Sequence, residues 1–293
     1  LGVVGDWENY YSTMSYDAEA QIVRELGKFL KEGSLYRGFK PVLWSTVEKT
    51  ALADAEVEYQ NHKSDTIYAA FQVKSSKIKE LSNSEIIIWT TTPWTMPGNR
   101  AVAYGDDISY QIVEVVESNE GSLCAKGDVL VIANDLAHNV IKEIGVGEIA
   151  LRASLMGCEM AGTVTAHPMA DHGYDYEVPL LAGSHVTTEQ GTGFVHIAPG
   201  HGVEDYELAH LKHGIAVPDT VNENGKIMEH LPLFGGMHVL RDNAKIADLM
   251  ASYKGVIGIG KLVHSYPHSW RSKAPVIYRN TAQWFVSMDS RGL

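Results

Sequence analysis

The order of apolar and polar residues predicts a helix near the start of the chain. Apolar side chains recur at helical spacing across residues 17–32: they are Ile22, Val23, Leu26, Phe29 and Leu30. Asp17 falls in the acidic first turn, and Gly33 follows the last turn. Similar signals predict further helices over residues 134–144, 203–212 and 243–253.

Most of the remaining chain shows short apolar and β-branched runs that alternate with turn-forming residues. Such runs predict strands. The expected strands cover residues 36–44, 67–74, 86–91, 101–104, 110–117, 129–133, 147–166, 176–181, 184–188, 192–197 and a strand-rich tail over 256–286. Many short strands with a few helices predict a mixed α/β fold whose core is β-barrel-like, closed or nearly closed, with flanking helices.

Residues 86–99 hold the most informative segment, in which an apolar run leads into consecutive threonines. The run predicts a buried strand, and Pro93 and Pro97 then force the chain to turn. The segment places four hydroxyls at the end of a rigid strand, which we call the threonine strip: Thr90, Thr91, Thr92 and Thr95. Such a strip suits a polar ligand. Threonines at strand ends also form ordinary local hydrogen bonds, so both interpretations stay open.

A second segment, residues 191–206, combines a short strand, a Pro-Gly-His-Gly turn and an acidic helix start. A carboxylate at a helix N-terminus keeps its charge, so we expect Asp205 to be ionised and able to bind an ammonium group. The alternative is that Asp205 only caps the helix. His196 and His201 add a third possibility, a metal site with Asp205, but their spacing matches no zinc pattern. A strand histidine such as His196 is more often a packed residue than a ligand.

Composition narrows the class of protein. The 293 residues carry 24 Lys and Arg against 36 Asp and Glu, a net charge of −12, so any nucleic acid must be bound by a local patch or by other parts of a longer protein. No apolar run is long enough to span a membrane, and Cys124 and Cys158 cannot form a disulfide framework. We therefore expect a cytoplasmic protein. No P-loop, dinucleotide-binding or nucleophile-elbow motif is present.

The ends of the sequence suggest a fragment. The chain starts without Met and stops shortly after the aromatic pair Trp284-Phe285. We expect it to be a piece of a longer chain.

These segments together resemble isoleucyl-tRNA synthetases, and specifically the editing domain inserted into their class I catalytic fold. The motifs that carry the resemblance are Leu1-Gly-Val-Val-Gly-Asp-Trp7, Lys40-Pro-Val-Leu-Trp44, residues 51–59, Trp89-Thr-Thr-Thr-Pro-Trp-Thr-Met-Pro-Gly-Asn99, residues 191–206, His264-Ser-Tyr-Pro-His268 and Gln283-Trp-Phe-Val-Ser-Met-Asp289. Valyl and leucyl enzymes have an arginine and an acidic residue where Thr92 and Trp94 stand, so the likeness favours the isoleucyl branch.

The resemblance implies a domain plan and an activity. It assigns residues 1–52 to a connector with a helix and a stalk strand, 53–255 to the editing domain, and 256–293 to a return connector, with the connectors forming a β-ribbon stalk. Isoleucyl enzymes are the standard illustration that one missing methylene costs only about 1–3 kcal/mol of binding, so valine must be removed by a second pocket. The implied activity is hydrolysis of valine esterified to the 3′ end of isoleucine tRNA, by a monomer joined to the rest of the synthetase chain.

The resemblance also implies residue roles. Asp205 would bind the α-ammonium, while His196 and the threonine strip would wall a pocket too tight for isoleucine. Thr90, Thr91, Thr92 and Asn99 would hold the ribose and position water, so that no protein nucleophile is needed. The remaining substrate contacts would come from Trp89 or Trp94, which support the strip or stack on the base, and from Thr95 and His201.

One departure from the family pattern concerns zinc. The family often has two cysteine pairs where this chain has Ser45, Glu48, Ser269 and Ser272, so we expect no zinc there and no cofactor in this fragment. We expect packing of Trp44 and Trp270 to hold the two segments together instead. ATP and magnesium would belong to the synthetic site of the full-length enzyme.

Two other classes of function stay open at this stage. The chain could bind valine-like aminoacyl groups without turnover, or it could be a structural connector whose editing has decayed. Deacylation by wild type and by Asp205→Ala would separate these from a hydrolase.

Overall fold

The computed structural model describes residues 2–288, so Leu1 and Asp289 of the quoted motifs lie outside the described residues. Two compact units make up the chain: Pro41–Asn280, and a smaller unit that runs up to Lys40 and resumes at Thr281. The domain boundaries expected after residues 52 and 255 are functional divisions and stay a prediction.

The smaller unit contains α1 (Tyr16–Lys31), which confirms the helix predicted from spacing. The Ser15 hydroxyl caps this helix by accepting a hydrogen bond from the Ala18 amide at 3.4 Å. None of the helix residues is buried, although one face is apolar. In the same unit Tyr36 stacks on Phe285, with ring centroids 5.6 Å apart.

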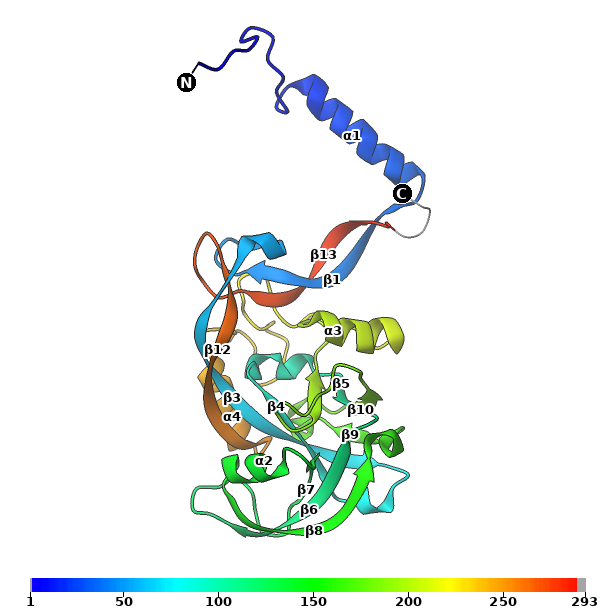
Figure 1. Cartoon of the computed structure of the whole chain (residues 1–293), viewed down its shortest axis with the longest axis vertical. Coiled ribbons are helices and arrows are strands. Elements are labelled where there is room, and N and C mark those ends of the chain that lie inside the picture. Colours follow the sequence, from blue (N-terminus) through cyan, green and yellow to red (C-terminus); the bar gives the residue numbers. More distant parts are fainter. Residues whose placement is uncertain (1, 289–293) are drawn as a thin grey trace. The chain divides into compact units, whose positions relative to one another are not determined.

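The larger unit is organised around a ten-stranded sheet with the order β11-β5-β10-β9-β3-β4-β7-β6-β8, and β12 paired to β3 (Figure 1). Its strands are β3 (Val57–Ser75), β4 (Glu85–Thr90), β5 (Ala101–Tyr104), β6 (Ser109–Ser118), β7 (Val129–Ala133), β8 (Val146–Met156), β9 (Val164–Ala166), β10 (Glu177–Ala182), β11 (Phe194–Ile197) and β12 (Val256–Ser269). A second sheet has the order β13-β1-β2, from β13 (Ile277–Val286), β1 (Leu35–Ser45) and β2 (Thr50–Ala51).

Short helices and turns connect these strands. The α-helices of the larger unit are α2 (Ala137–Glu143), α3 (Val203–Asp205) and α4 (Asn243–Ser252), and α3 continues into a π-helix, η6 (Tyr206–Lys212). The 3₁₀ turns are η1 (Asp54–Glu56), η2 (Lys79–Leu81), η3 (Pro93–Gly98), η4 (Gly157–Met160) and η5 (Ala170–His172). Of the helices in residues 2–288, none is both long and apolar enough to cross a membrane.

The mixed α/β class is confirmed, but the barrel-like core is not confirmed, because no closed sheet is found among the described residues. Within the described residues the sheet is an open path whose ends are β11 and β8. The reason is β3, which is 19 residues long and pairs with β12, β4 and β9 along successive parts of its length. A long strand that changes partners bends the sheet without closing it.

Several local predictions also needed correction. Residues 184–188 form a turn, closed by the Val186 amide bonding to the Gly183 carbonyl, and not a strand. The strand expected over 147–166 is interrupted at Gly157, where a Cβ would lie 1.9 Å from the Gly105 carbonyl oxygen. The helix expected from 134 begins later, at Ala137, without a side-chain cap.

The centre of the core is β4, as its sequence predicts. Ile86, Ile87 and Ile88 are each 0% exposed, because β4 lies between β3 and β7 and both of its faces are covered. The same cluster includes Phe71 and Leu130, also fully buried. The strand that leads to the threonine strip is therefore the most constrained in the sheet.

Truncation of this strand should lower stability strongly. Ile87→Ala should reduce the free energy of unfolding by about 2–5 kcal/mol, since it removes buried methyl groups and leaves a cavity. Urea unfolding measures the change. Leu151→Ala, at a position 62% exposed on β8, is the control, and an equal loss in both variants would contradict this account of the core.

Candidate functional site

The threonine strip begins where β4 ends and the chain turns into η3. The Thr90 hydroxyl oxygen accepts from the Thr92 amide at 3.1 Å, and the Thr95 hydroxyl donates to the Thr92 carbonyl at 2.8 Å. The strip is thus partly tied up in local hydrogen bonds. Thr95 is only 5% exposed, so it faces the interior and not a ligand in front of the strand.

His196 lies behind this turn, between Asn99 and Thr95 of the strip. Its Nδ1 is 2.8 Å from the Asn99 side-chain nitrogen, and its Nε2 is 2.9 Å from the Thr95 hydroxyl oxygen. The Thr95 proton is already given to Thr92, so we assign the imidazole as accepting from Asn99 and donating to Thr95. Both ring nitrogens of His196 therefore have hydrogen-bond partners within the protein.

This placement changes the expected role of two residues. Asn99 is fully buried and also donates to the Ala101 carbonyl at 2.9 Å, which directs it into the fold. Burial, with smaller contributions from His167 and His201, lowers the pKa of His196 to about 3. His196 is therefore a neutral support for Thr95, held at 8% exposure.

Three residues that sequence analysis missed satisfy the carbonyl groups of η3. Arg100 donates to the carbonyls of Pro97 and Asn99, and Tyr176 also donates to the Asn99 carbonyl, at 2.9 Å. The His167 ring donates to a third carbonyl, that of Met96, at 2.9 Å. Arg100 directly follows the quoted motif, whereas nothing in the sequence around His167 or Tyr176 connects either residue with this turn.

The second predicted segment packs against the same turn. The His201 ring lies edge-on to Trp94, with centroids 5.0 Å apart, and a Cβ on Gly98 would come within 3.2 Å of His201. His201 donates through Nδ1 to the Tyr278 carbonyl at 2.9 Å and accepts at Nε2 from the Thr220 hydroxyl at 2.6 Å. Burial lowers its pKa to about 4, so it too is neutral.

Asp205 contacts the same packed loop. Its Oδ2 accepts from the Ala198 amide at 2.8 Å, and Ala198 in turn lies beside Gly98 of η3. The expectation that Asp205 stays ionised in the free protein is wrong at acidic pH. Burial raises its pKa to about 7, because one amide donor offsets only part of the desolvation cost.

The three-residue metal alternative gains no support. The nitrogens of His196 and His201 are engaged by protein groups, and no cluster of three His, Cys, Asp or Glu residues among residues 2–288 is arranged to hold a metal ion.

In front of the strip the structure forms a cleft of about 60 Å³. Thr91, Thr92 and Trp94 line one side, and the paired strands β3 and β12 line the other. The remaining lining residues are His62, Lys63, Ser64, Asp65, Val239, Leu240, Asn243 and Tyr266. Asp205, His196 and Trp89 are not among the described residues that line it.

The cleft combines polar and aromatic groups. Thr91 and Thr92 line it together with the rings of His62 and Tyr266, whose centroids lie 5.0 Å apart. The Asn243 side-chain oxygen is buried and has no hydrogen-bond partner among the described residues. Such a cleft can bind a ligand with hydrogen-bond donors and a flat ring, and it can hold an ordered water. Only Tyr266 of this far wall falls in a motif quoted from the sequence.

Comparisons with known proteins agree with the fold and the motifs. The model of the class I tRNA synthetases (I, L, M and V) matches residues 1–291, so the chain belongs to that family. Within it, the chain is 56% identical over 293 residues to the isoleucine--tRNA ligase of Pelagibacter ubique (strain HTCC1062), covering 100% of this chain and 32% of that protein. It is 44% identical over 302 residues to the isoleucine--tRNA ligase of Gluconobacter oxydans (strain 621H), covering 99% and 31%.

The chain therefore spans about a third of the length of these relatives. Among solved structures, GlLeuRS-CP1 has a TM-score of 0.52 at 12% identity and covers 67% of this chain and 98% of its own. At that identity the likeness concerns the fold alone, which is similar to that of GlLeuRS-CP1.

Asp205→Asn should make stability less dependent on pH. The pKa of Asp205 is about 7 in the folded chain against an ordinary value of 3.8, so the folded state keeps a proton that the unfolded state loses between these values. This group should cost the wild type up to about 1.4 kcal/mol of stability per pH unit as the pH rises from about 4 to about 7. Urea unfolding across that range measures it. A difference between the two proteins that does not change with pH would contradict the assignment.

The ring of His196 should not titrate near neutrality. Because burial holds its pKa at about 3, its ¹⁵N signals should stay those of a neutral imidazole from about pH 5 to about pH 8. His196→Gln identifies the signal by its loss. A midpoint within that range would show that the ring is hydrated and open to a ligand.

Proposed function

We propose that this chain is the editing part of an isoleucine-tRNA ligase and that it hydrolyses valine esterified to isoleucine tRNA. The observation that carries the proposal is the rigid end of β4, whose threonines open onto a cleft between η3 and the β3–β12 pair. Membership of the synthetase family and the CP1 fold support it.

The chemistry asked of the site is modest. An aminoacyl ester is already activated, so orienting a water molecule and the neighbouring ribose hydroxyl supplies much of the rate. Thr91 and Thr92 offer hydroxyls at the cleft, and η3 cannot relax because Arg100, His167 and Tyr176 bind its carbonyls. Fixed donors and acceptors of this kind favour one water position.

The aromatic residues of the cleft suit the rest of the substrate. Trp94, His62 and Tyr266 present ring surfaces on which a nucleoside base can stack. The Asn243 oxygen and the threonine hydroxyls can bind ribose hydroxyls. This division would leave the amino acid side chain nearest to η3, whose residues are buried and leave little room for an extra methylene.

Asp205 does not line the cleft, so it would bind the α-ammonium only if the substrate reached past the packed loop at Ala198, and only after Asp205 had lost its proton. An ammonium group close to a carboxylate favours the charged form and lowers its pKa, so substrate binding would release the proton near neutral pH. The site would thus be charged when occupied and close to neutral when empty.

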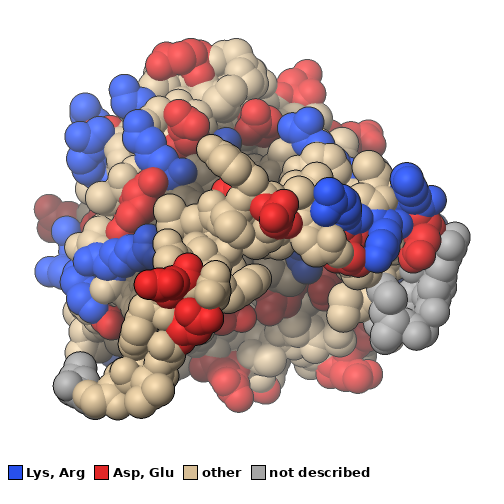
Figure 2. Space-filling view, turned by 90° about the horizontal axis from the view of Figure 1, so that it is seen from above, with Lys and Arg blue, Asp and Glu red and all other residues tan. Residues whose placement is uncertain are grey.

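The partners follow from this proposal. They are the 3′ end of isoleucine tRNA carrying valine and the rest of a monomeric cytoplasmic synthetase, whose synthetic site would use ATP and magnesium. On the face shown in Figure 2, Lys and Arg side chains lie in separate groups with acidic residues between them. With a net charge of −12, most of the affinity for tRNA would come from other parts of the synthetase.

Deacylation assays test the proposal directly. The chain should release valine from Val-tRNA(Ile) and leave Ile-tRNA(Ile) intact, and Asp205→Ala should lower kcat/KM by about 10- to 100-fold through loss of a charge-assisted hydrogen bond. Glu148→Ala, an exposed change on β8, is the matched control.

The outcomes separate the classes of function. Binding of a valyl-adenosine analogue without hydrolysis by the wild type would indicate a binding-only module. Neither binding nor hydrolysis would indicate a connector. Equal rates for wild type and Asp205→Ala would remove Asp205 from the site while leaving the hydrolase in place.

A further inference from the structure

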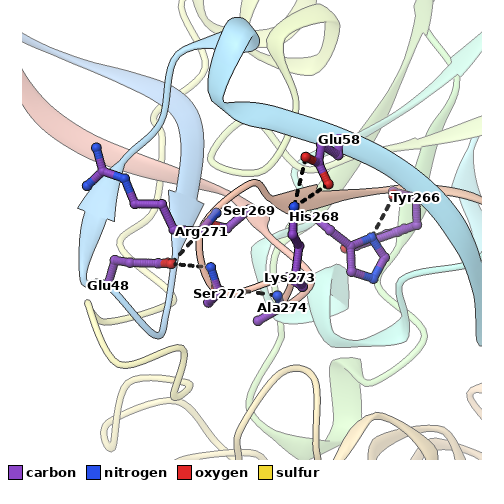
Figure 3. Close-up of polar contacts among 9 residues, drawn as sticks. All are labelled: Glu48, Glu58, Tyr266, His268, Ser269, Arg271, Ser272, Lys273 and Ala274. Carbon is purple, nitrogen blue, oxygen red and sulfur yellow. Dashed lines mark hydrogen bonds and ion pairs between the residues drawn. The ribbon is translucent and has the colours of Figure 1, made fainter.

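Three of the four positions at which the family often has cysteines hold serines in this chain, and all three bond to the carboxylate at the fourth position, Glu48. Figure 3 shows the contacts with Ser269 and Ser272. Glu48 Oε1 accepts from the Ser269 hydroxyl at 3.0 Å and from the Ser272 amide at 3.0 Å. Its other oxygen, Oε2, accepts from the Ser45 hydroxyl. Ser45 and Ser269 are almost fully buried, at 1% and 0% exposure. Glu48 therefore joins the turn after β1 to the turn after β12.

This donor set does not fit a zinc ion. Zinc in such a ribbon requires thiolates or imidazoles, whereas here two hydroxyls and an amide point their hydrogens at a single carboxylate. Figure 3 draws one imidazole, that of His268, whose Nδ1 lies 2.8 Å from the Tyr266 carbonyl oxygen. The sequence has no thiol at these four positions, and in the structure the groups that are present bond to one another.

The expected role of the two tryptophans is wrong in part. Trp44 does pack into the core at 8% exposure and donates to the Glu223 carbonyl at 2.9 Å. Trp270 is 45% exposed, with Arg271 over its ring. The two segments are joined by polar contacts with Glu48, because a tryptophan in an exposed turn has little surface to pack against.

Two ion pairs link the same turn to η1 and to the beginning of β3. Lys273 binds Glu58 at 2.7 Å, and Arg271 lies 3.6 Å from Glu56. Burial alone would raise the pKa of Glu48, but hydrogen bonds from Ser272 and Ser269 outweigh it and hold that pKa below its ordinary value. Hydrogen bonds to an ionised acceptor are about twice as strong as neutral ones.

We propose that the Glu48 carboxylate is a built-in cross-link that occupies the place of the metal ion. It joins residues 45–48 to residues 269–273 through hydrogen bonds alone, and it makes this end of the β3–β12 pair independent of zinc. Tyr266 of the cleft lies in β12 only three residues before Ser269, so the cross-link also positions one wall of the cleft.

Thermal unfolding of the 293-residue chain with and without a chelator tests the cross-link. Glu48→Ala and Glu48→Gln should each lower Tm by about 3–8 °C, because buried donors lose an ionised acceptor, while EDTA should move the wild-type Tm by less than about 1 °C. Glu148→Gln, exposed on β8, should match the wild type. Wild-type Tm values in both Glu48 variants would overturn the proposal.

A converse variant tests whether the carboxylate stands where a metal would. The fourfold change S45C, E48C, S269C and S272C should bind about one zinc per chain by elemental analysis, and EDTA should then lower its Tm. A folded fourfold variant that takes up no zinc would overturn the inference. So would a wild-type protein that carries one zinc per chain and loses stability on chelation. Neither readout depends on the deacylase activity, so a failure here is distinct from a failure of the proposed function.

Discussion

The constraint on which the candidate site depends is the burial of the turn that ends β4. Pro93, Trp94, Met96 and Pro97 are all buried, and the prolines supply no amide hydrogens. Backbone carbonyls that leave water must find donors, or the turn costs several kcal/mol. Arg100, His167 and Tyr176 are those donors, and His196 supports the same turn through Thr95. The threonines are held in place because everything behind them is satisfied.

The same burial explains the charges around the site. His196, His167 and His201 all have lowered pKa values, so three imidazoles around one turn carry no charge at neutral pH. Asp205 is also desolvated, which raises its pKa to about 7, so it keeps its proton at mildly acidic pH. A low-dielectric setting favours neutral groups until a ligand brings the opposite charge. An aminoacyl ester with its ammonium is a ligand of that kind.

Sequence patterns predicted some parts of this structure well and others poorly. The run before Thr90 is apolar throughout, and only a central strand of the sheet can bury such a run, so β4 was predicted correctly. The expected strand began only at residue 67, because polar side chains hide the strand pattern before it, yet β3 begins at Val57 and is held there by β12. The barrel-like core was not confirmed for a related reason, since the change of partners along β3 is a tertiary feature that periodicity does not record.

The residues of the candidate site were likewise predicted in part. Motifs identified the segment that carries the strip and the loop that carries His201, and Trp94 of the first does pack against His201 of the second. They did not identify Glu48 as a structural centre, because the sequence shows only which ligands are missing. Nor did they identify His62, whose position in the cleft is set by pairing with His264 across two strands. Contacts between distant segments of this kind require coordinates.

The pairing of β3 with β12 has one more consequence, which concerns alignment between strands. Their partners run in step from Val57 opposite Ser269 to Ile67 opposite Ile259, and an irregularity follows between Val256 and Gly258. In such a ladder a slip by one position would turn every side chain to the opposite face. The ring of His62 would then leave the cleft. The turns joined by Glu48 at one end and the irregularity at the other therefore both oppose a shift in the register of the two strands.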